Sequence, residues 1–325
     1  MKKKILAALL AAVMLLTLAA CAASEPAASS DGGTATYTVG ICQLVQHDAL
    51  DAATKGFIDA LNEALPGQVK IEEKNASGDS ANCSTIVNGF VSEGVDLIMA
   101  NATPALTAAA AATSDIPILG TSITAYGVAL DIDGFTGTVG GNISGTSDLA
   151  DLEKQANMIT EWFPDEQKVG LLFCSAEPNS RYQIEEVAKH LSAKGIQTQE
   201  FAFTDTNDVA SVTQSAADYA DVIYIPTDNT AASNTEAISN ILVPAGVPAI
   251  TGEEGICKGC GVATLSISYY DLGVTTGKMA ARILTGEANV SEMPIEFTEA
   301  TPKYNAAMCE ALGITPLDGY TAIEE

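Results

Sequence analysis

The sequence is poor in basic residues. Its 325 residues contain 15 lysines and arginines against 41 aspartates and glutamates, and the formal net charge is −26. A surface of this sign offers few cations to replace the counterions of a phosphate backbone. The composition therefore argues against nucleic acid as a partner.

Motifs typical of enzymes are also missing. The chain has no GxSxG, HExxH or P-loop pattern, and its only two histidines, His47 and His190, stand far apart. Carboxylates are plentiful, but no pair stands out as the acid and base of a glycosidase. We therefore expect no enzymatic activity, no cofactor and no metal site.

The cysteines do not form a metal-binding motif. Cys257 and Cys260 have the CxxC spacing of zinc and redox sites, but a second CxxC and a nearby histidine are absent. Several other cysteines stand in apolar segments, where cysteine behaves as a small hydrophobic residue. A local disulfide between Cys257 and Cys260 and free thiols both remain open, and we favour free thiols.

Apolar runs of more than ten residues are confined to the first twenty positions. Three lysines precede the apolar run from Ile5 to Leu16. This run is too short to span a bilayer of about 30 Å, but it suits the core of a signal peptide. We therefore expect residues 1–20 to be a signal peptide.

The residues around position 21 predict a lipid anchor. Leu18-Ala19-Ala20 before Cys21 resembles a bacterial lipobox, which implies lipidation of Cys21. The alternative is an ordinary secretory signal in which the cysteine is incidental. Residues 21–36 are rich in small residues and lack apolar periodicity, so we expect a flexible tether. The expected location is the extracellular face of the cell membrane, with the lipid as the only membrane attachment.

Cleavage after residue 20 would leave about 300 residues, which is enough for two domains. It would also change the net charge from −26 to −29, because it removes three lysines and no acid.

Beyond the tether, short apolar segments alternate with segments of helical periodicity. The first half contains four expected strands, which begin at Tyr37, Val69, Asp96 and Ile116. Strands that alternate with helices in this way form right-handed βαβ units and a parallel sheet.

The same order of elements returns in the second half. The matching positions Val39 and Val169 are 130 residues apart, and Asp96 and Asp221 are 125 residues apart. A repeat of this size predicts an α/β fold with two similar lobes, each a parallel sheet flanked by helices, joined by a hinge. We expect lobe 1 to comprise residues 37–144 and about 265–292. Lobe 2 would comprise residues 145–264 and about 293–325.

Polar residues follow the expected strands in both halves. Ligands of open α/β sheets bind at the carboxyl ends of the strands, so these residues are candidates for one cleft between the lobes. They offer hydrogen-bond donors and acceptors without a pair of nucleophile and base. The candidates are Gln43, His47, Asn101, Thr103, Thr121, Ser122, Glu177, Asn179, Ser180, Thr227, Asp228, Asn229 and Glu253.

Several of these segments resemble the ABC-transporter substrate-binding proteins of the TrpX type. The resemblance is carried, in order along nearly the whole chain after the tether, by residues 43–57, 101–104, 177–180, 226–229, 252–255 and 267–273. It implies a periplasmic-binding-protein fold of type I with three crossings between the lobes. It also implies delivery of a solute, in several members an aromatic amino acid, to an ABC permease.

The resemblance further implies roles for single residues. Asn179 and Ser180 match the element that binds the ligand's carboxylate, and the start of a helix favours an anion there. Asp228 matches the acid that pairs with the ligand's ammonium group. Helix capping by Asn179 and Ser180 and a solvated turn position for Asp228 are the alternatives. The candidates for the side-chain pocket are Gln43, His47 and Tyr269, although a surface position for His47 remains open.

Together these observations predict the extracytoplasmic solute-binding component of an ABC importer. It would capture Trp, Tyr or Phe between two lobes by hinge closure, act as a monomer, and have a membrane permease as its partner. The alternatives are a ligand-binding sensor lipoprotein for a membrane receptor and an importer component for a non-aromatic amino acid or another small solute.

Overall fold

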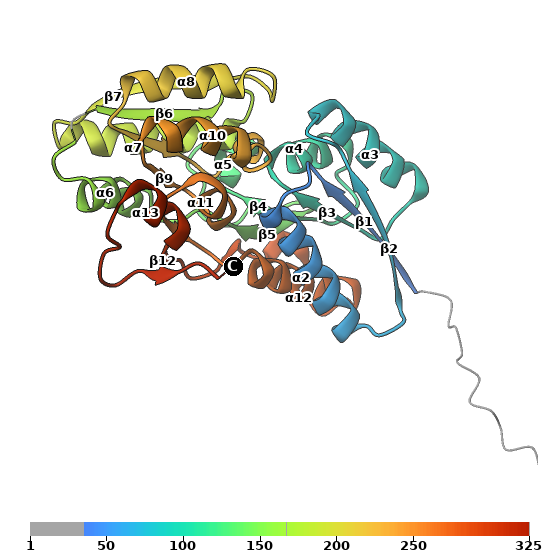
Figure 1. Ribbon diagram of the computed structural model, residues 1–325. Helices are drawn as coiled ribbons and strands as arrows, with labels where there is room; N and C mark the ends of the chain where they lie inside the picture. Colours follow the sequence, from blue (N-terminus) through green and yellow to red (C-terminus); the bar gives the residue numbers. More distant parts are fainter. Residues whose placement is uncertain (1–35, 167, 325) are drawn as a thin grey trace, which may run out of the picture. The chain divides into compact units, whose positions relative to one another are not determined.

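The computed structural model describes residues 36–166 and 168–324. The expected signal peptide, Cys21 and nearly all of the tether lie outside these described residues. The described residues form two sheets, and the chain passes between them three times (Figure 1). This arrangement confirms the predicted α/β class with two similar lobes.

The first lobe is built on a sheet of six parallel strands in the order β11-β5-β4-β3-β1-β2. The strands are β1 (Tyr37–Gln43), β2 (Val69–Asn75), β3 (Leu97–Asn101), β4 (Ile118–Ile123), β5 (Ile143–Ser147) and β11 (Glu296–Phe297). The helices are α2 (Asp48–Ala64), α3 (Ser80–Glu93), α4 (Thr103–Ala112), α5 (Tyr126–Ala129), α12 (Tyr269–Leu284) and the short 3₁₀ helix η1 (Val290–Glu292).

The second lobe is built on a sheet of seven strands in the order β13-β12-β10-β9-β8-β6-β7, in which only the pair β10–β12 is antiparallel. The strands are β6 (Lys168–Cys174), β7 (Gln197–Phe203), β8 (Val222–Ile225), β9 (Ala249–Thr251), β10 (Ala263–Ser266), β12 (Thr301–Tyr304) and β13 (Thr321–Ala322). The helices are α6 (Leu152–Trp162), α7 (Pro178–Ala193), α8 (Val209–Tyr219), α9 (Asn229–Ala232), α10 (Thr235–Ala245), α11 (Glu254–Cys260) and α13 (Ala306–Leu312).

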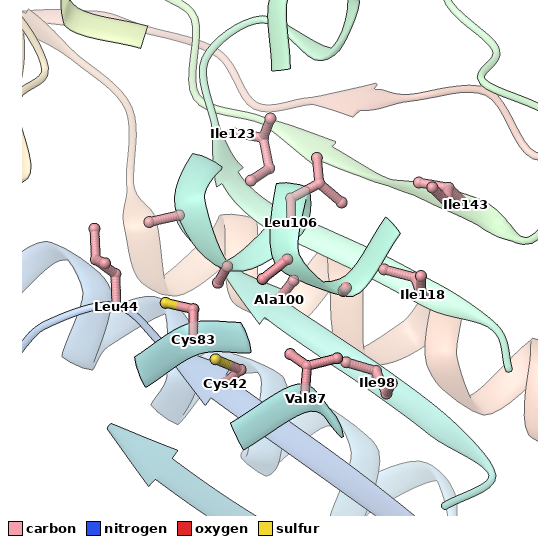
Figure 2. Packing of buried hydrophobic residues seen from close by; sticks show 14 of the residues in the cluster. Cys42, Leu44, Cys83, Val87, Ile98, Ala100, Leu106, Ile118, Ile123 and Ile143 are labelled. Atoms are coloured by element: carbon pink, nitrogen blue, oxygen red, sulfur yellow. The ribbon is translucent and has the colours of Figure 1, made fainter. Parts of the chain in front are cut away.

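Each sheet is buried on both faces because its central strands are apolar throughout. In β3, Ile98 and Ala100 pack into one hydrophobic cluster with side chains of α3 and α4 (Figure 2). Leu97 and Met99 point to the other face and pack with α2 and α12. Successive side chains of a strand point to opposite faces, so an uninterrupted apolar strand needs helices on both sides.

Six cysteines fall within the described residues, and all are buried free thiols. Cys42 of β1 and Cys83 of α3 lie beside each other in the core of the first lobe (Figure 2). Within the described part of the chain, no group of three or more His, Cys, Asp or Glu side chains is placed to hold a metal ion. No helix of that part is long and apolar enough to cross a membrane.

Two strands next to the crossings carry little apolar signal. The first is β5, with the sequence ISGTS, and the second is β11, which has two residues. Both belong to the first sheet, so the chain leaves that sheet after Ser147 and, later, after Phe297. The lobe boundaries expected from the sequence, at residue 144 and at about residue 292, stand at these two places, where the sequence lacks an apolar run.

The helices α2 and α12 lie side by side and approach through glycines (Figure 1). A Cβ atom on Gly56 would stand 2.1 Å from the carbonyl oxygen of Tyr270, and one on Gly273 would stand 2.0 Å from that of Ala53. Atoms at such distances overlap. The contact therefore requires glycine at both positions, and it fixes the start of α12, where the second crossing ends.

We predict that Gly273→Ala destabilises the protein by about 1–3 kcal/mol, because the added methyl group forces the two helices apart. Gly89→Ala in α3 is the matched control. Its nearest neighbour would be the end of the Lys74 side chain at 4.0 Å, so the better helix propensity of alanine should leave stability unchanged or raise it by up to about 1 kcal/mol. Urea unfolding of both variants measures the difference, and equal effects would contradict the steric explanation.

Candidate functional site

A small cavity of about 10 Å³ lies where the strand ends of both lobes meet the crossings. This volume holds about one water molecule, so a ligand can enter only when the lining side chains or the lobes move apart. It is lined by His47, Leu50, Ser122, Thr124, Asp148, Asn179, Thr227, Asp228, Asn229, Ala232, Glu253 and Tyr269. A larger, open hollow of about 770 Å³ is lined only by residues 43–77 of the first lobe.

The structure brings together most, but not all, of the residues expected at the site. Eight of the expected residues line the cavity: His47, Ser122, Asn179, Thr227, Asp228, Asn229, Glu253 and Tyr269. Six are not among its lining residues: Gln43, Asn101, Thr103, Thr121, Glu177 and Ser180. Four lining residues were not expected from the sequence: Leu50, Thr124, Asp148 and Ala232.

Gln43 and Asn101 belong to a buried polar network inside the first lobe. The Gln43 amide oxygen accepts a hydrogen bond of 2.6 Å from the Thr54 hydroxyl, and the Asn101 amide nitrogen donates to that hydroxyl at 2.9 Å. The Gln43 amide nitrogen donates to Asp51 at 2.6 Å. These bonds tie the ends of β1 and β3 to α2 and hold that helix in position at the cleft.

Thr103 and Thr121 are also buried within the first lobe. Thr103 opens α4 and is 3% exposed. The Thr121 hydroxyl lies 3.3 Å from that of Thr146, which in turn lies 2.9 Å from that of Thr276 in α12. This chain of hydroxyl groups connects β4, β5 and α12 inside the first lobe.

Glu177 anchors the loop that carries three of the lining residues. Its carboxylate accepts hydrogen bonds from the backbone N–H groups of Asn229 and Thr230, at 3.1 and 2.9 Å, and from both of their side chains. Removal of this carboxylate would leave four donors without a partner at the start of α9. Glu177 therefore positions Thr227, Asp228 and Asn229 without lining the cavity itself.

Asp228 is a carboxylate buried at the carboxyl end of β8, with 1% of its surface exposed. It accepts hydrogen bonds from the backbone N–H groups of Cys174 (2.6 Å) and Ala231 (2.8 Å), and so caps α9. Burial and, second to it, the neighbouring Glu177 raise its pKa to about 8, although the hydrogen bonds, including one with Ser180, oppose the rise. Buried acids with strongly shifted pKa values concentrate at functional sites.

Asn179 presents an acceptor to its surroundings. Its amide nitrogen donates to the Thr227 carbonyl oxygen at 3.1 Å and lies 3.4 Å from the Glu177 carboxylate. Both neighbours are acceptors, so the nitrogen must face them and the amide orientation is fixed. The remaining Oδ1 atom is buried and has no partner among the described residues. This oxygen can accept a hydrogen bond from a ligand's ammonium group but cannot bind a carboxylate.

Ser122 is held in an uncommon backbone conformation at the end of β4. Its φ angle is +55°, and the pairing of β4 with β5 shifts register between Gly120 and Ile123. Such strain in a residue other than glycine concentrates at functional sites. The Ser122 hydroxyl is buried without a partner in the described part of the chain, so it is free to donate to a ligand.

Asp148 follows β5 directly and was missed because β5 lacks an apolar run. Its Oδ2 accepts a hydrogen bond of 3.0 Å from the Tyr269 hydroxyl, and its Oδ1 has no partner among the described residues. Burial raises the pKa of Asp148 to about 6. The sequence feature that could have indicated Asp148 is an acid directly after a short polar strand, at the first crossing between the lobes.

Two further titratable side chains complete the lining. Glu253 caps α11 by accepting from the N–H groups of Gly255 and Ile256, and burial raises its pKa to about 7. Burial lowers the pKa of His47, whose Nε2 lies 3.3 Å from the Asn229 side-chain oxygen in the other lobe. Because that oxygen accepts, Nε2 carries the proton.

When its acids ionise, the cavity therefore carries charge of one sign. Three buried carboxylates, Asp148, Asp228 and Glu253, line it, and its described lining residues include no lysine or arginine. A buried carboxylate without a counter-ion is costly. The arrangement complements a ligand that carries a positive charge and several hydrogen-bond donors.

Comparison with known proteins agrees with this geometry. Residues 38–318 match the model of the family described as ABC transporter substrate binding protein. The chain belongs to this family. It is therefore the substrate-binding component of an ABC transporter, as predicted. A curated relative, the tyrosine-binding protein of Clostridioides difficile (strain R20291), is 32% identical over 269 residues, which cover 81% of this chain and 76% of the relative.

Solved structures give the same result. An ABC domain from Streptococcus pneumoniae in complex with L-Trp is 30% identical, with a TM-score of 0.84, over 89% of this chain and 100% of that one. A ligand-free, open substrate-binding protein with adhesive properties from Clostridium difficile is 32% identical, with a TM-score of 0.67, over 89% and 99% of the two chains. At similar identity, the substrate-binding protein described here is thus closer to the ligand-bound structure.

More distant structures share the fold alone. A glucose-galactose binding protein from Geobacillus stearothermophilus is 14% identical, with a TM-score of 0.60, over 84% of this chain and 98% of that one.

We predict that the ligand-free protein loses stability as the pH rises from 5 to 8. The pKa of Asp228 is about 8 in the folded state and near 4 in an unfolded chain, so the folded state binds the extra proton across this range. Stability from such a group is present below pH 4 and lost as the pH rises through 8. Asp228→Asn should flatten the dependence by about 1 kcal/mol or more in urea unfolding.

Asp115→Asn, which removes an exposed acid, is the control for the change in net charge. If both variants keep the slope of the unchanged protein, Asp228 is ionised throughout and the explanation fails.

Proposed function

We propose that this protein captures an aromatic amino acid, Trp, Tyr or Phe, between its two lobes for import by an ABC permease. The observation that carries the proposal is the closed cavity with three buried carboxylates and no lysine or arginine among its described lining residues. An amino acid's ammonium group supplies the positive charge that such a cavity lacks. The named ligands of two relatives, tyrosine and L-Trp, support an aromatic side chain.

The ammonium group is held at the strand ends of the second lobe. Asp228, which gives up its proton when the ammonium group binds, supplies the charge there, and the unpartnered Oδ1 of Asn179 supplies a further acceptor. Both residues border Thr227, to whose carbonyl oxygen Asn179 is bound. Hydrogen bonds to a charged group are stronger than neutral ones, so this corner favours a ligand with an ammonium group.

The ligand's carboxylate is held from the first lobe. The Ser122 hydroxyl is a buried donor without a partner in the described residues, and Thr124 lines the cavity beside it. The aromatic side chain packs against apolar and ring surfaces of Leu50, Ala232, His47 and Tyr269. Because the ligand touches both lobes, only the closed arrangement forms all of these contacts, and binding stabilises closure.

The protein acts at the outer face of the cell membrane as a monomer. The supporting sequence is the expected signal peptide of residues 1–20, the lipidated Cys21 and the tether up to residue 36. The two lobes, close to the expected ranges 37–144 with about 265–292 and 145–264 with about 293–325, move as rigid bodies about the three crossings. The closed surface is presented to the permease, and the protein has no catalytic role.

The proposal predicts that only aromatic amino acids raise the melting temperature of the purified protein, among a panel of amino acids, sugars and small peptides. A ligand at about a thousand times its dissociation constant adds roughly 4 kcal/mol of stability. Asp228→Asn should abolish the response because it removes the charge that pairs with the ammonium group. Differential scanning calorimetry measures both effects.

Asp115→Asn, an exposed acid, should respond like the unchanged protein. A rise in melting temperature with a sugar or a peptide, but with no amino acid, would overturn the proposal.

A further inference from the structure

The cavity holds a second acid–acceptor group, away from the proposed ammonium site. Asp148 lies at the first crossing between the lobes, directly after β5, and is 5% exposed. Its partner Tyr269 opens α12 at the second crossing. The hydroxyl of Tyr269 donates to Oδ2 of Asp148 at 3.0 Å, so the carboxylate is held by an element outside the loop that carries Asp228.

The other oxygen of Asp148 is free to meet a ligand. Oδ1 is buried and has no hydrogen-bond partner among the described residues, and the side chain lines the cavity. Thr124, another lining residue, is a hydrogen-bonding neighbour of the carboxylate and lowers its pKa. A buried acceptor without a partner is costly, and a carboxylate can accept only from a donor. The ligand must therefore bring a donor to this position.

In the proposed function, the ligand's ammonium group binds to Asp228 and Asn179. Asp228 and the free Oδ1 of Asn179 stand together at the strand ends of the second lobe, where Asn179 is bonded to Thr227. Asp148 belongs instead to the crossings, next to the ring of Tyr269, where an aromatic side chain finds a surface to pack on. The donor that reaches Asp148 is thus on the ligand's side chain.

Resting on the proposed function, we propose that Asp148 is a specificity-determining residue that accepts a hydrogen bond from the ligand's side chain, with Tyr269 as its positioning residue. The site then selects amino acids with a ring donor, the phenol O–H of tyrosine or the indole N–H of tryptophan, over phenylalanine. Phenylalanine would bury Oδ1 of Asp148 without a partner. Sites built to hydrogen-bond a group discriminate strongly against ligands that lack it.

The test is isothermal titration calorimetry at pH 7.5 with tyrosine, tryptophan and phenylalanine. The unchanged protein should bind tyrosine or tryptophan about 10- to 100-fold more tightly than phenylalanine, the range for a hydrogen bond to a charged group. In Asp148→Ala this ratio should fall to about 3 or less, mainly through weaker binding of the ligand with the ring donor. Tyr269→Phe should reduce the ratio in part, because the carboxylate loses the bond that orients it.

Asp148→Asn provides a second variant of equal size, in which a neutral acceptor should leave a ratio between those of Asp148→Ala and the unchanged protein. Equal loss of all three ligands in the Asp148 variants would show a structural role or an ammonium contact and overturn the inference, while the proposed function stands. Phenylalanine bound as tightly as both other ligands by the unchanged protein would also overturn it. Binding of none of the three would overturn the proposed function itself.

Discussion

The hydrogen bonds that Asp228 accepts from the backbone hold the second half of the cleft together. Its carboxylate joins the N–H of Cys174, at the end of β6, to the N–H of Ala231, in the first turn of α9. Two strand ends and a helix start are thereby fixed around one buried acid. A neutral residue could cap the helix at a lower desolvation cost than a carboxylate. An acid at this position is therefore best explained by a cationic group on the ligand.

The unpartnered atoms around the cavity follow the same logic. Asn179 Oδ1, Ser122 Oγ and Asp148 Oδ1 are all buried without a partner among the described residues, and all three residues line one cavity. Buried polar groups are normally hydrogen-bonded. Three exceptions around one cavity indicate which groups the ligand carries. The oxygens of Asn179 and Asp148 each require a hydrogen-bond donor, and the Ser122 hydroxyl can donate to a carboxylate.

Much of this could be predicted from the sequence, because apolar strands and the repeat of whole units determine the lobes. The polar residues after β8, Thr227, Asp228 and Asn229, reached the cavity because strand ends converge there. Gln43 and Asn101 follow strands in the same way, yet they turn toward Thr54 and α2. The hydrogen-bond partner of a polar side chain depends on tertiary packing. A position at the end of a strand does not specify that partner.

Asp148 was missed for a related reason. The segment ISGTS of β5 pairs with β4 through its backbone and buries small polar residues, so it lacks the apolar pattern by which strands are recognised. The strand β5 is defined by its pairing with β4, whose register shifts next to Ser122. This pairing is a tertiary contact that the sequence of β5 alone does not reveal.

The position of Asp148 links ligand recognition to closure. Asp148 and Tyr269 stand on two of the three crossings, which are the segments that must bend when the lobes move. A hydrogen bond between ligand and Asp148 therefore acts on the hinge, whereas the contacts of Asp228 act on one lobe. Since a ligand shifts a conformational equilibrium only by its differential contacts with the two states, a solute that satisfied the second lobe alone would bind without closing the protein.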